Sequence, residues 1–318
     1  MLTWLKLRAV KKSNKPYLII GMAHRRPSFE SVYQMVSENC DAEQLILKKS
    51  EMRKLPELLG DLPLDRFDAI WLDVAFKYMR LAADQLSRCK RLVFYEQDSL
   101  QDALPQSDWH TQFTSFYKSF SNARILTTGI FAANHLQQQG INAIASLKGY
   151  DPEHIFEEKA QHRSIDVGFI GSTNSRVYLE RKMVLETLEK EGHLNILREV
   201  AYGAPYRQAL NEIKVFVSAD IGLHEYMAKN FEAMAAGCAL VAYRQDNGEE
   251  ERLGLIHGKN CLLYQNLEQA KACIAQLSSD EALRQQIATA GQQLAHDSFS
   301  FDRIAKDISF AIKPELAK

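Results

Sequence analysis

A short stretch of the C-terminal half places an acid and a base where they could hold a nucleotide. A loop at Gly222–Met227 leads into a helix that carries Lys229 and Glu232, and a glycine and an apolar strand follow. Lys229 and Glu232 share roughly one helical face because of their spacing. The alanines around Glu232 let the helix approach a ligand closely, and its carboxylate needs a partner because burying it alone is costly. Two adjacent ribose hydroxyls would supply two donors, whereas Lys229 could meet a phosphate or pair with Glu232.

A second stretch that could bind phosphate runs from Gly168 to Arg176. An apolar strand ends at Gly171, and a hydroxyl-rich turn that begins with Ser172 leads into a helix. Backbone N–H groups at such a turn can cradle a phosphate, the helix N-terminus favours its charge, and Arg176 could add a charged contact. The stretch lacks a full dinucleotide or P-loop fingerprint. An N-capped helix start with a tight glycine turn explains the same residues equally well, so both interpretations stay open.

A third polar stretch, Tyr243–Glu251, follows a strand in the same half. It could form the lip of a donor pocket. The simpler interpretation, a solvated polar loop, is favoured.

The fold that would position these stretches is predicted from the alternation of apolar strands and helices. Strands are predicted at 17–21, 67–73, 91–95, 123–128, 141–145, 166–171, 214–218 and 238–243. Helices are predicted at 29–38 with Ser28 as the N-cap, and at 131–136, 178–190, 229–236, 267–277, 280–294 and 300–312. Such alternation predicts parallel sheets with right-handed crossovers, and open parallel sheets bind ligands outside the carboxyl ends of their strands.

Turn residues at Gly149–Pro152, followed by a polar stretch, mark a domain boundary. We therefore predict two Rossmann-like α/β domains with doubly wound parallel sheets, residues 1–148 and 149–318. The last helix, about 300–312, could pack back on the N-terminal domain. Two separately wound sheets suggest an interdomain cleft.

Composition fits a two-domain globular protein and excludes several classes. The chain has 318 residues and a net charge of -1, so no global field draws it to nucleic acid. Five scattered cysteines without a CxxC pair predict buried free thiols in a reducing cytoplasm rather than disulfides or a zinc site.

Apolar runs are too short for a membrane span. The basic, weakly apolar residues 1–12 are not expected to be a signal peptide; a solvated lead-in is favoured over an amphipathic helix on a membrane.

Specific motifs resemble a known family. The run from Lys229 to Val241 resembles the nucleotide-sugar motif of GT-B glycosyltransferases, particularly the group similar to the spore-maturation protein CgeB. The turn from Val167 to Ser172 and the His296 to Arg303 pattern are also typical of that group. The resemblance covers about Ala123 to Ile308 and implies the GT-B architecture.

The resemblance implies roles for the residues singled out above. Glu232 would bind the ribose hydroxyls of a nucleoside diphosphate, and the residues near the diphosphate would be Gly171, Ser172, Arg176 and Lys229. Related retaining enzymes carry a glutamate eight residues before the ribose glutamate, where this chain has His224 with Glu225 beside it. His224 is therefore a candidate catalytic residue and Glu225 a candidate donor-binding residue, and the stereochemical outcome stays open.

GT-B enzymes bind acceptors in the N-terminal domain, so the resemblance implies that a general base would come from there. Asp98 and His24 are the first candidates, and Glu96 and Asp73 also follow strands. Each could equally be an ordinary loop residue. The chain contains no Asp-x-Asp sequence, which agrees with a metal-independent reaction in which helix N-termini and basic side chains offset the leaving-group charge.

We therefore expect a cytoplasmic transferase without a cofactor. It would move a sugar from a nucleoside-diphosphate sugar to a glycan, lipid-linked or protein acceptor in bacterial surface polysaccharide or glycoconjugate synthesis. Peripheral contact with the inner membrane would be compatible with this role. Two alternatives stay open: a sugar-nucleotide epimerase or hydrolase of the same fold, and a non-catalytic nucleotide- or glycan-binding protein.

Overall fold

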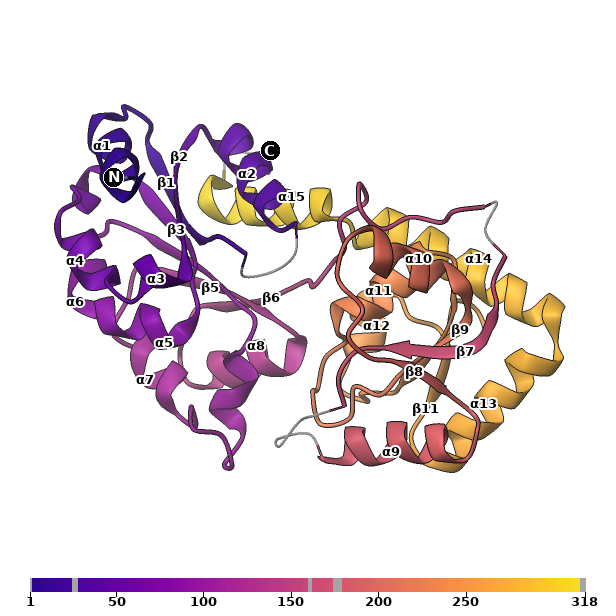
Figure 1. The fold of residues 1–318 in the computed structure, drawn as a ribbon. Coiled ribbons are helices and arrows are strands. Elements are labelled where there is room, and N and C mark those ends of the chain that lie inside the picture. The colour runs from indigo at the N-terminus through magenta and orange to yellow at the C-terminus, as the bar shows by residue number, and fades with distance from the viewer. Residues whose placement is uncertain (1, 25–27, 160–161, 174–178, 315–318) are drawn as a thin grey trace. The chain divides into compact units, whose positions relative to one another are not determined.

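The computed structural model describes residues 2–24, 28–159, 162–173 and 179–314, with the backbone alone for Leu2 and Thr3. The chain divides into two units. The first comprises the residues up to Leu147 together with those from Phe301 onward, and the second runs from Lys148 to Ser300. Each unit is built on its own parallel sheet (Figure 1).

The first unit has a six-stranded sheet in the order β2-β1-β3-β4-β5-β6, and every pairing is parallel. Its strands are β1 (Tyr17–Met22), β2 (Ala42–Leu47), β3 (Ala69–Asp73), β4 (Leu92–Glu96), β5 (Ala123–Thr128) and β6 (Ala143–Ser146). Apolar residues fill both faces of the central strands, as a sheet covered by helices on both sides requires. The two faces belong to two separate hydrophobic clusters.

One face of this sheet packs against α2 (Glu30–Cys40) and α15 (Phe301–Ile312), where Trp71 of β3 and Ile304 of α15 are both fully buried. The C-terminal helix thus completes the core of the first unit. The other face carries short helices (Figure 1). They are α1 (Leu2–Lys12), α3 (Lys49–Met52), α4 (Leu55–Gly60), η1 (Leu64–Arg66), α5 (Phe76–Met79), η2 (Arg80–Ala82), α6 (Ala83–Leu86), η3 (Ser99–Ala103), α7 (Gln112–Tyr117) and α8 (Ile130–Gln138).

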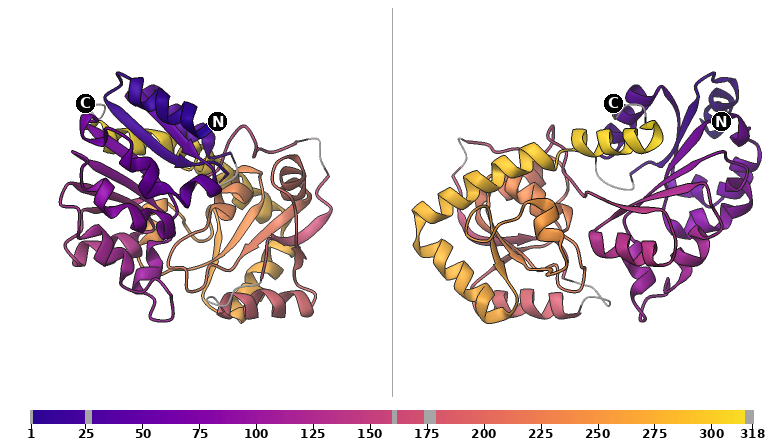
Figure 2. Two further views of the ribbon diagram at one scale, coloured as in Figure 1. Left: turned by 60° about the vertical axis from the view of Figure 1, so that its left-hand side comes forward. Right: turned by 180° about the vertical axis from the view of Figure 1, so that it is seen from behind.

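The second unit has a five-stranded sheet in the order β11-β10-β9-β7-β8, again with every pairing parallel. Its strands are β7 (Ile165–Ile170), β8 (Asn195–Leu197), β9 (Ile213–Ser218), β10 (Ala239–Tyr243) and β11 (Leu262–Tyr264). Its helices are α9 (Leu179–Lys190), α10 (Ala204–Glu212), α11 (Ala228–Ala235), α12 (Glu249–Leu253), α13 (Leu267–Ser279) and α14 (Glu281–Ser298). The helix α14 packs along β10 and α11, whereas α13 packs along β11 (Figure 2).

The strand order of this sheet reverses between β7 and β9. From β7 the chain goes to β8 on one side and then to β9 on the other side. A crevice forms outside the carboxyl ends of strands at such a reversal, and ligands of open α/β sheets bind there. The topology therefore directs attention to the residues that follow β7 and β9.

The predicted doubly wound parallel sheets are confirmed, although several elements were not anticipated. The strands β2, β8 and β11 and the helices α10 and α12 had no predicted counterpart. The predicted N-cap Ser28 is wrong: α2 begins after Phe29, and the Ser28 carbonyl instead accepts hydrogen bonds from the backbone and side chain of Ser31. The predicted solvated lead-in is also wrong, because residues 2–12 form α1 and its Val10 is fully buried.

One absence and one confirmed expectation concern both units. Within the described ranges, no helix has the length and apolar character needed to span a membrane. All five cysteines are buried free thiols, as predicted.

Candidate functional site

The strand β7 ends at Gly171, and the amine of Lys229 lies directly against this glycine. The Lys229 ammonium donates to the Ile170 carbonyl at 2.8 Å. Gly171 has a φ of +139°, and a Cβ atom placed on it would come within 2.0 Å of Lys229 Nζ. Only glycine gives the chain this conformation without strain and also leaves room for the amine. The structure thus brings together two residues that the sequence predicted to lie near one diphosphate.

A second cation, Arg181 of α9, lies beside Lys229. The Arg181 guanidinium and the Lys229 ammonium lie 5.5 Å and 5.1 Å from the centroid of the same Phe169 ring. Arg181 Nε is buried and has no hydrogen-bond partner among the described residues. Burial lowers the pKa of Lys229, and the neighbouring Arg181 lowers it further. Two cations held together against their mutual repulsion, with a donor left unused, form a site for an anion.

The helix α11 carries Glu232, one turn beyond Lys229. Its carboxylate is half-buried, and Glu232 Oε2 accepts a hydrogen bond of 2.6 Å from the hydroxyl of Tyr206 on α10. Burial, and then the charge of Glu232, raise the pKa of Tyr206, so this phenol stays a donor. Glu232 also favours the charged form of Lys229. The carboxylate is therefore fixed in orientation beside the two cations.

The start of α11 is positioned by a residue that the sequence analysis did not single out. Asp220, which follows β9, is almost fully buried and accepts through Oδ2 from the Met227 N–H at 3.1 Å and from Asn230 Nδ2 at 2.6 Å. Both donors lie at the first turn of α11, so this carboxylate fixes the helix that carries Lys229 and Glu232. Its place directly after a predicted strand was the available signal.

The loop between Asp220 and α11 contains His224 and Glu225. Glu225 was predicted to bind the donor, but its Oε1 accepts from Lys148 Nζ at 2.6 Å, and both side chains are less than a tenth exposed. This buried ion pair positions the loop. His224 adopts a left-handed φ of +52° and is half-buried, and desolvation lowers its pKa, so the imidazole is neutral at pH 7. Asn247 donates to the His224 carbonyl at 2.9 Å.

Two further predicted residues follow β7 in the sequence. Ser172 follows Gly171 directly and is exposed. Arg176 lies outside the described residues. Within the described part of the chain, no three histidine, cysteine or acidic side chains are grouped as a metal would require.

The stretch Tyr243–Glu251 is not the solvated loop that was favoured. Its end forms α12, in which Glu249 and Glu250 are buried. Glu250 accepts from the Tyr226 hydroxyl at 2.6 Å, and Glu249 pairs with Arg252 at 2.9 Å. Glu250 can be buried because the more distant Tyr226 donates to it, and Glu249 because Arg252 on the same helix pairs with it.

The base candidates of the first unit differ sharply in exposure. Asp98 is exposed, and its N–H donates to Glu96 at 2.9 Å. His24 is also exposed, with Nδ1 3.5 Å from a carboxylate oxygen of Glu30. Asp73 and Glu96 are fully buried and accept from tyrosine hydroxyls. Of the four, Asp98 and His24 are therefore the ones accessible to an acceptor, and their catalytic role remains a prediction.

Part of the chain matches a protein family, and several solved structures share its fold. Residues 156–309 match the family described as glycosyl transferase-like. HepE of Anabaena, solved with UDP-glucose, is 14% identical with a TM-score of 0.68, and the alignment covers 94% of this chain and 99% of HepE. Sucrose-phosphate synthase of Thermosynechococcus elongatus is 11% identical with a TM-score of 0.66, covering 96% of this chain and 100% of the synthase. The T4 phage BGT, solved with UDP and Mn2+, is 11% identical with a TM-score of 0.55, covering 95% and 100%. No curated protein sequence matches the chain.

The fold and the site together define a GT-B protein with two Rossmann-like units, as the sequence predicted. The matched residues cover most of the second unit, and this part of the chain is similar to the glycosyl transferase-like family. The narrower resemblance to the CgeB group stays a prediction.

Proposed function

We propose that the protein transfers a sugar from a uridine-diphosphate sugar, or a closely similar nucleoside-diphosphate sugar, to an acceptor hydroxyl. The observation that supports this most is the position of Lys229 against Gly171, with Arg181 on the same aromatic ring. Three solved structures with this fold carry UDP or UDP-glucose. A diphosphate supplies the anion that the two cations lack.

In this proposal each donor-site residue meets a different part of the nucleotide. The Gly171–Ser172 turn, Lys229, Arg181 and the N-terminus of α11 would hold the diphosphate. Glu232 would accept from the ribose, with Tyr206 fixing its orientation. As the sugar leaves, negative charge grows on the diphosphate, and fixed cations stabilise that charge. We therefore propose that no cofactor and no metal ion is needed.

The acceptor hydroxyl must lose its proton during the transfer. We propose the first unit as the acceptor-binding unit, with Asp98 or His24 as general base because both side chains are exposed. His224, neutral at pH 7, is proposed to face the donor sugar. Separate Asp98→Asn, His24→Gln and His224→Gln variants should bind UDP normally, and the one that removes the base should lose transfer.

The donor assignment is tested by combining a binding screen with one variant. We expect nucleoside diphosphates to raise the melting temperature, since a ligand at a hundredfold excess over its dissociation constant stabilises by about 2.7 kcal/mol. Glu232→Ala should remain folded but lose both this shift and sugar transfer. Activity with added EDTA should equal activity with Mn2+. Full transfer by Glu232→Ala would overturn the donor assignment.

A sugar-nucleotide hydrolase or epimerase remains the second candidate. Such an enzyme needs acids and bases around the nucleotide sugar, and His224 lies in the loop before α11. Incubation with UDP-glucose and no acceptor distinguishes the two. A transferase should leave the donor largely intact, whereas rapid turnover to free sugar or an epimer would favour the second candidate. A non-catalytic binding protein would bind UDP but show neither reaction with any acceptor.

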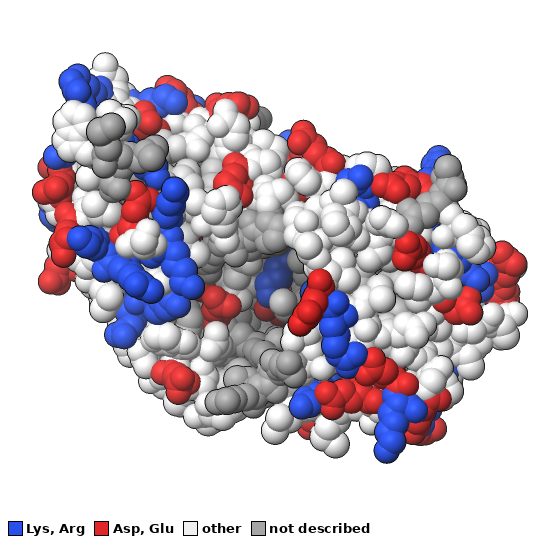
Figure 3. All heavy atoms as spheres, viewed as in Figure 1, with Lys and Arg blue, Asp and Glu red and all other residues white. Residues whose placement is uncertain are grey.

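We further propose that the transferase acts in the cytoplasm at the inner membrane, in surface polysaccharide or glycoconjugate synthesis with a glycan, lipid-linked or protein acceptor. In α1, Trp4 and Leu5 are more than half exposed, and Lys11 and Lys12 lie at its exposed end. Lys6 of α1 pairs with Glu51 of α3 at 3.2 Å. This joins α1 to a second exposed basic segment, formed by Lys48, Lys49, Arg53 and Lys54. Lysine and arginine side chains gather on this side of the first unit (Figure 3).

Exposed apolar and basic side chains on one helix fit an anionic bilayer surface. Sedimentation with vesicles tests this proposal. The protein should bind vesicles that contain phosphatidylglycerol and not vesicles of phosphatidylcholine alone. Trp4→Ser/Leu5→Ser should weaken binding, whereas Leu81→Ser, which removes an exposed leucine elsewhere on the unit, should not. Equal binding by both variants would contradict the proposed contact.

A further inference from the structure

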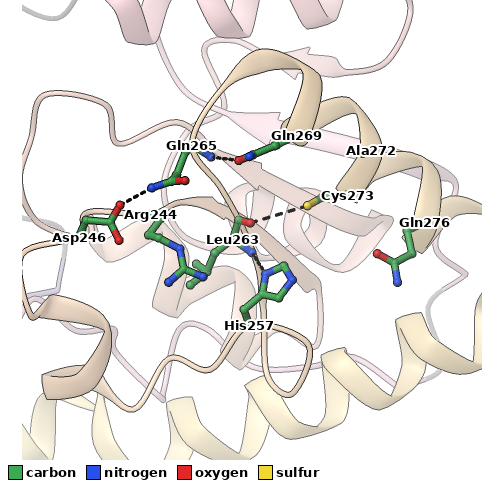
Figure 4. Close-up of a pocket in the computed structure, with 9 residues that line it drawn as sticks. All are labelled: Arg244, Asp246, His257, Leu263, Gln265, Gln269, Ala272, Cys273 and Gln276. Atoms are coloured by element: carbon green, nitrogen blue, oxygen red, sulfur yellow. Dashed lines mark hydrogen bonds between the residues drawn. The ribbon is translucent and has the colours of Figure 1, made fainter.

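The second unit contains a hollow that none of the donor-site residues lines. It lies beside the edge strand β11 and the helix α13, and its cavity volume is about 510 Å³ (Figure 4). Ligand pockets commonly have volumes of roughly 300–1,000 Å³. The carboxyl ends of β7 and β9, where Lys229 and Glu232 lie, contribute nothing to its wall. The hollow is therefore a separate feature of this unit.

Its floor is apolar and its rim is polar. Leu263 and Cys273 at the floor are 6% and 8% exposed. Gln269 and Gln276 come from the face of α13 that also carries Cys273, and both amides are exposed. A sugar ring has an apolar face of C–H groups and a periphery of hydroxyls, so a hollow with this distribution suits a saccharide.

Two internal hydrogen bonds occupy an acceptor atom of His257 and of Gln269, so the donor groups of these two side chains remain. The His257 Nδ1 atom accepts from the Leu263 N–H at 2.9 Å, so the neutral ring carries its proton on Nε2. The Gln269 Oε1 atom accepts from the Gln265 N–H at 2.8 Å, which leaves the Gln269 NH₂ group as a donor. Both bonds are drawn in Figure 4.

Arg244 adds a cation to this set of donors. Its backbone N–H is fixed to the Tyr264 carbonyl at 2.8 Å, and its half-buried side chain lines the cavity. Among the residues that the structure describes, the guanidinium has neither a hydrogen bond nor an ion pair. Asp246, the carboxylate of this wall, accepts from the amide of Gln265 instead. The wall thus presents a guanidinium that Asp246 does not pair with, next to neighbouring N–H donors.

We propose that this hollow is a second ligand site, which takes an acidic saccharide: a sugar that carries a phosphate or a carboxylate. Arg244 binds the anionic group, because a guanidinium matches both anions with two parallel hydrogen bonds. His257 and Gln269 donate to that group or to ring hydroxyls, and the apolar floor contacts the ring. The site is independent of the donor assignment.

Calorimetric titration of the full chain tests this site. The probes are glucose 6-phosphate and glucuronate, with glucose as the neutral control and inorganic phosphate as the sugar-free control. We expect at least one acidic sugar to bind tenfold or more tightly than either control, with the same affinity in the presence and absence of UDP. The more tightly bound acidic probe identifies whether the natural group is a phosphate or a carboxylate.

Variants locate the site. Arg244→Met should weaken binding of the acidic sugar at least tenfold, whereas Arg198→Met, which removes an exposed arginine paired with Glu189 in the same unit, should not. Gln269→Glu, an exposed substitution that leaves the core untouched, should also abolish binding by repelling the anion. Competition by UDP, unchanged affinity in Arg244→Met, or no binding at millimolar concentration would each overturn the proposal. Failure of UDP to bind while the acidic sugar still binds would count against the donor assignment alone.

Discussion

Both units place charged groups at the carboxyl ends of parallel strands, yet they use them differently. In the first unit Asp73 and Glu96 end β3 and β4, and both are fully buried and accept from the hydroxyls of Tyr33 and Tyr117 at 2.7 Å and 3.1 Å. In the second unit Lys229 and Arg181 both lie near the Phe169 ring at the end of β7, and within the described part of the chain neither makes an ion pair.

The difference shows that position at a strand end is not sufficient for a binding role. A fully buried carboxylate that receives neutral donors from its own unit is part of the packing. A pair of like charges that shares one ring is unfavourable until an anion arrives. The charges of the second unit therefore favour an incoming anion, and the following variants separate the two uses of charge.

The largest effect on stability is expected at the buried ion pair of Lys148 and Glu225. Lys148→Met leaves a buried carboxylate uncompensated, which costs about 3–5 kcal/mol of unfolding free energy. Lys214→Met breaks a pair of similar length, 2.7 Å, but in that pair Asp166 is 76% exposed. Such a pair contributes only about 0–1 kcal/mol. Urea denaturation compares the variants, and equal stabilities would show that the Lys148 pair does not position the loop.

Such pairs show which parts of the structure could be predicted from the sequence. Long apolar runs predicted β1, β3, β4 and β5 because a strand buried on both faces reads as a continuous apolar run. The strands β8 and β11 have three residues each, too few for any period. Lys148 and Glu225 are 77 residues apart, and nothing local links them.

The motif on α11 was predictable for a different reason. Lys229 and Glu232 form a local motif, whereas Arg181 and Tyr206, which complete the site, come from other helices. Glu249 and Glu250 were expected to be solvated. The partner of Glu250, Tyr226, lies outside the run of charged residues, and Arg252 reaches Glu249 only because α12 is helical. Spacing therefore predicts the motif, and only the fold supplies the surrounding donors.

A pair of tyrosine variants compares the two units directly. Tyr33→Phe removes a donor from buried Asp73 and should cost about 1–3 kcal/mol, with UDP affinity unchanged. Tyr206→Phe removes the donor to half-buried Glu232 and should weaken UDP binding severalfold. Denaturation and calorimetry measure the two effects. If Tyr33→Phe weakened UDP binding as much as Tyr206→Phe, the division between structural and ligand-binding charges would be wrong.

Gly171→Ala tests the close approach at the end of β7. Alanine at a φ of +139° is strained by about 1–3 kcal/mol. The new methyl group also displaces the Lys229 amine. UDP affinity should therefore fall further than the loss of unfolding free energy alone would explain. Gly203→Ala is the matched control, with a φ of +100° and open space around its Cβ. Equal UDP affinities in the two variants would place the diphosphate elsewhere.

The smallest effect is a dependence of UDP binding on pH. Burial lowers the pKa of Lys229 below 10.5, so the ammonium loses its proton at a lower pH than an exposed lysine does. Deprotonation removes a positive charge from the site, and UDP affinity should therefore fall as the pH rises through this lowered pKa. Lys229→Arg should bind UDP without this alkaline decline, since arginine stays charged. An identical decline in wild type and Lys229→Arg would assign it to another group.

Calorimetric titration of UDP into Lys229→Met and Glu232→Gln, with Lys214→Met as a surface-charge control, tests the donor site most directly. We predict that Lys214→Met binds like wild type, and that each donor-site variant binds at least tenfold more weakly while remaining folded by circular dichroism. Wild-type affinity in both folded donor-site variants would contradict the account.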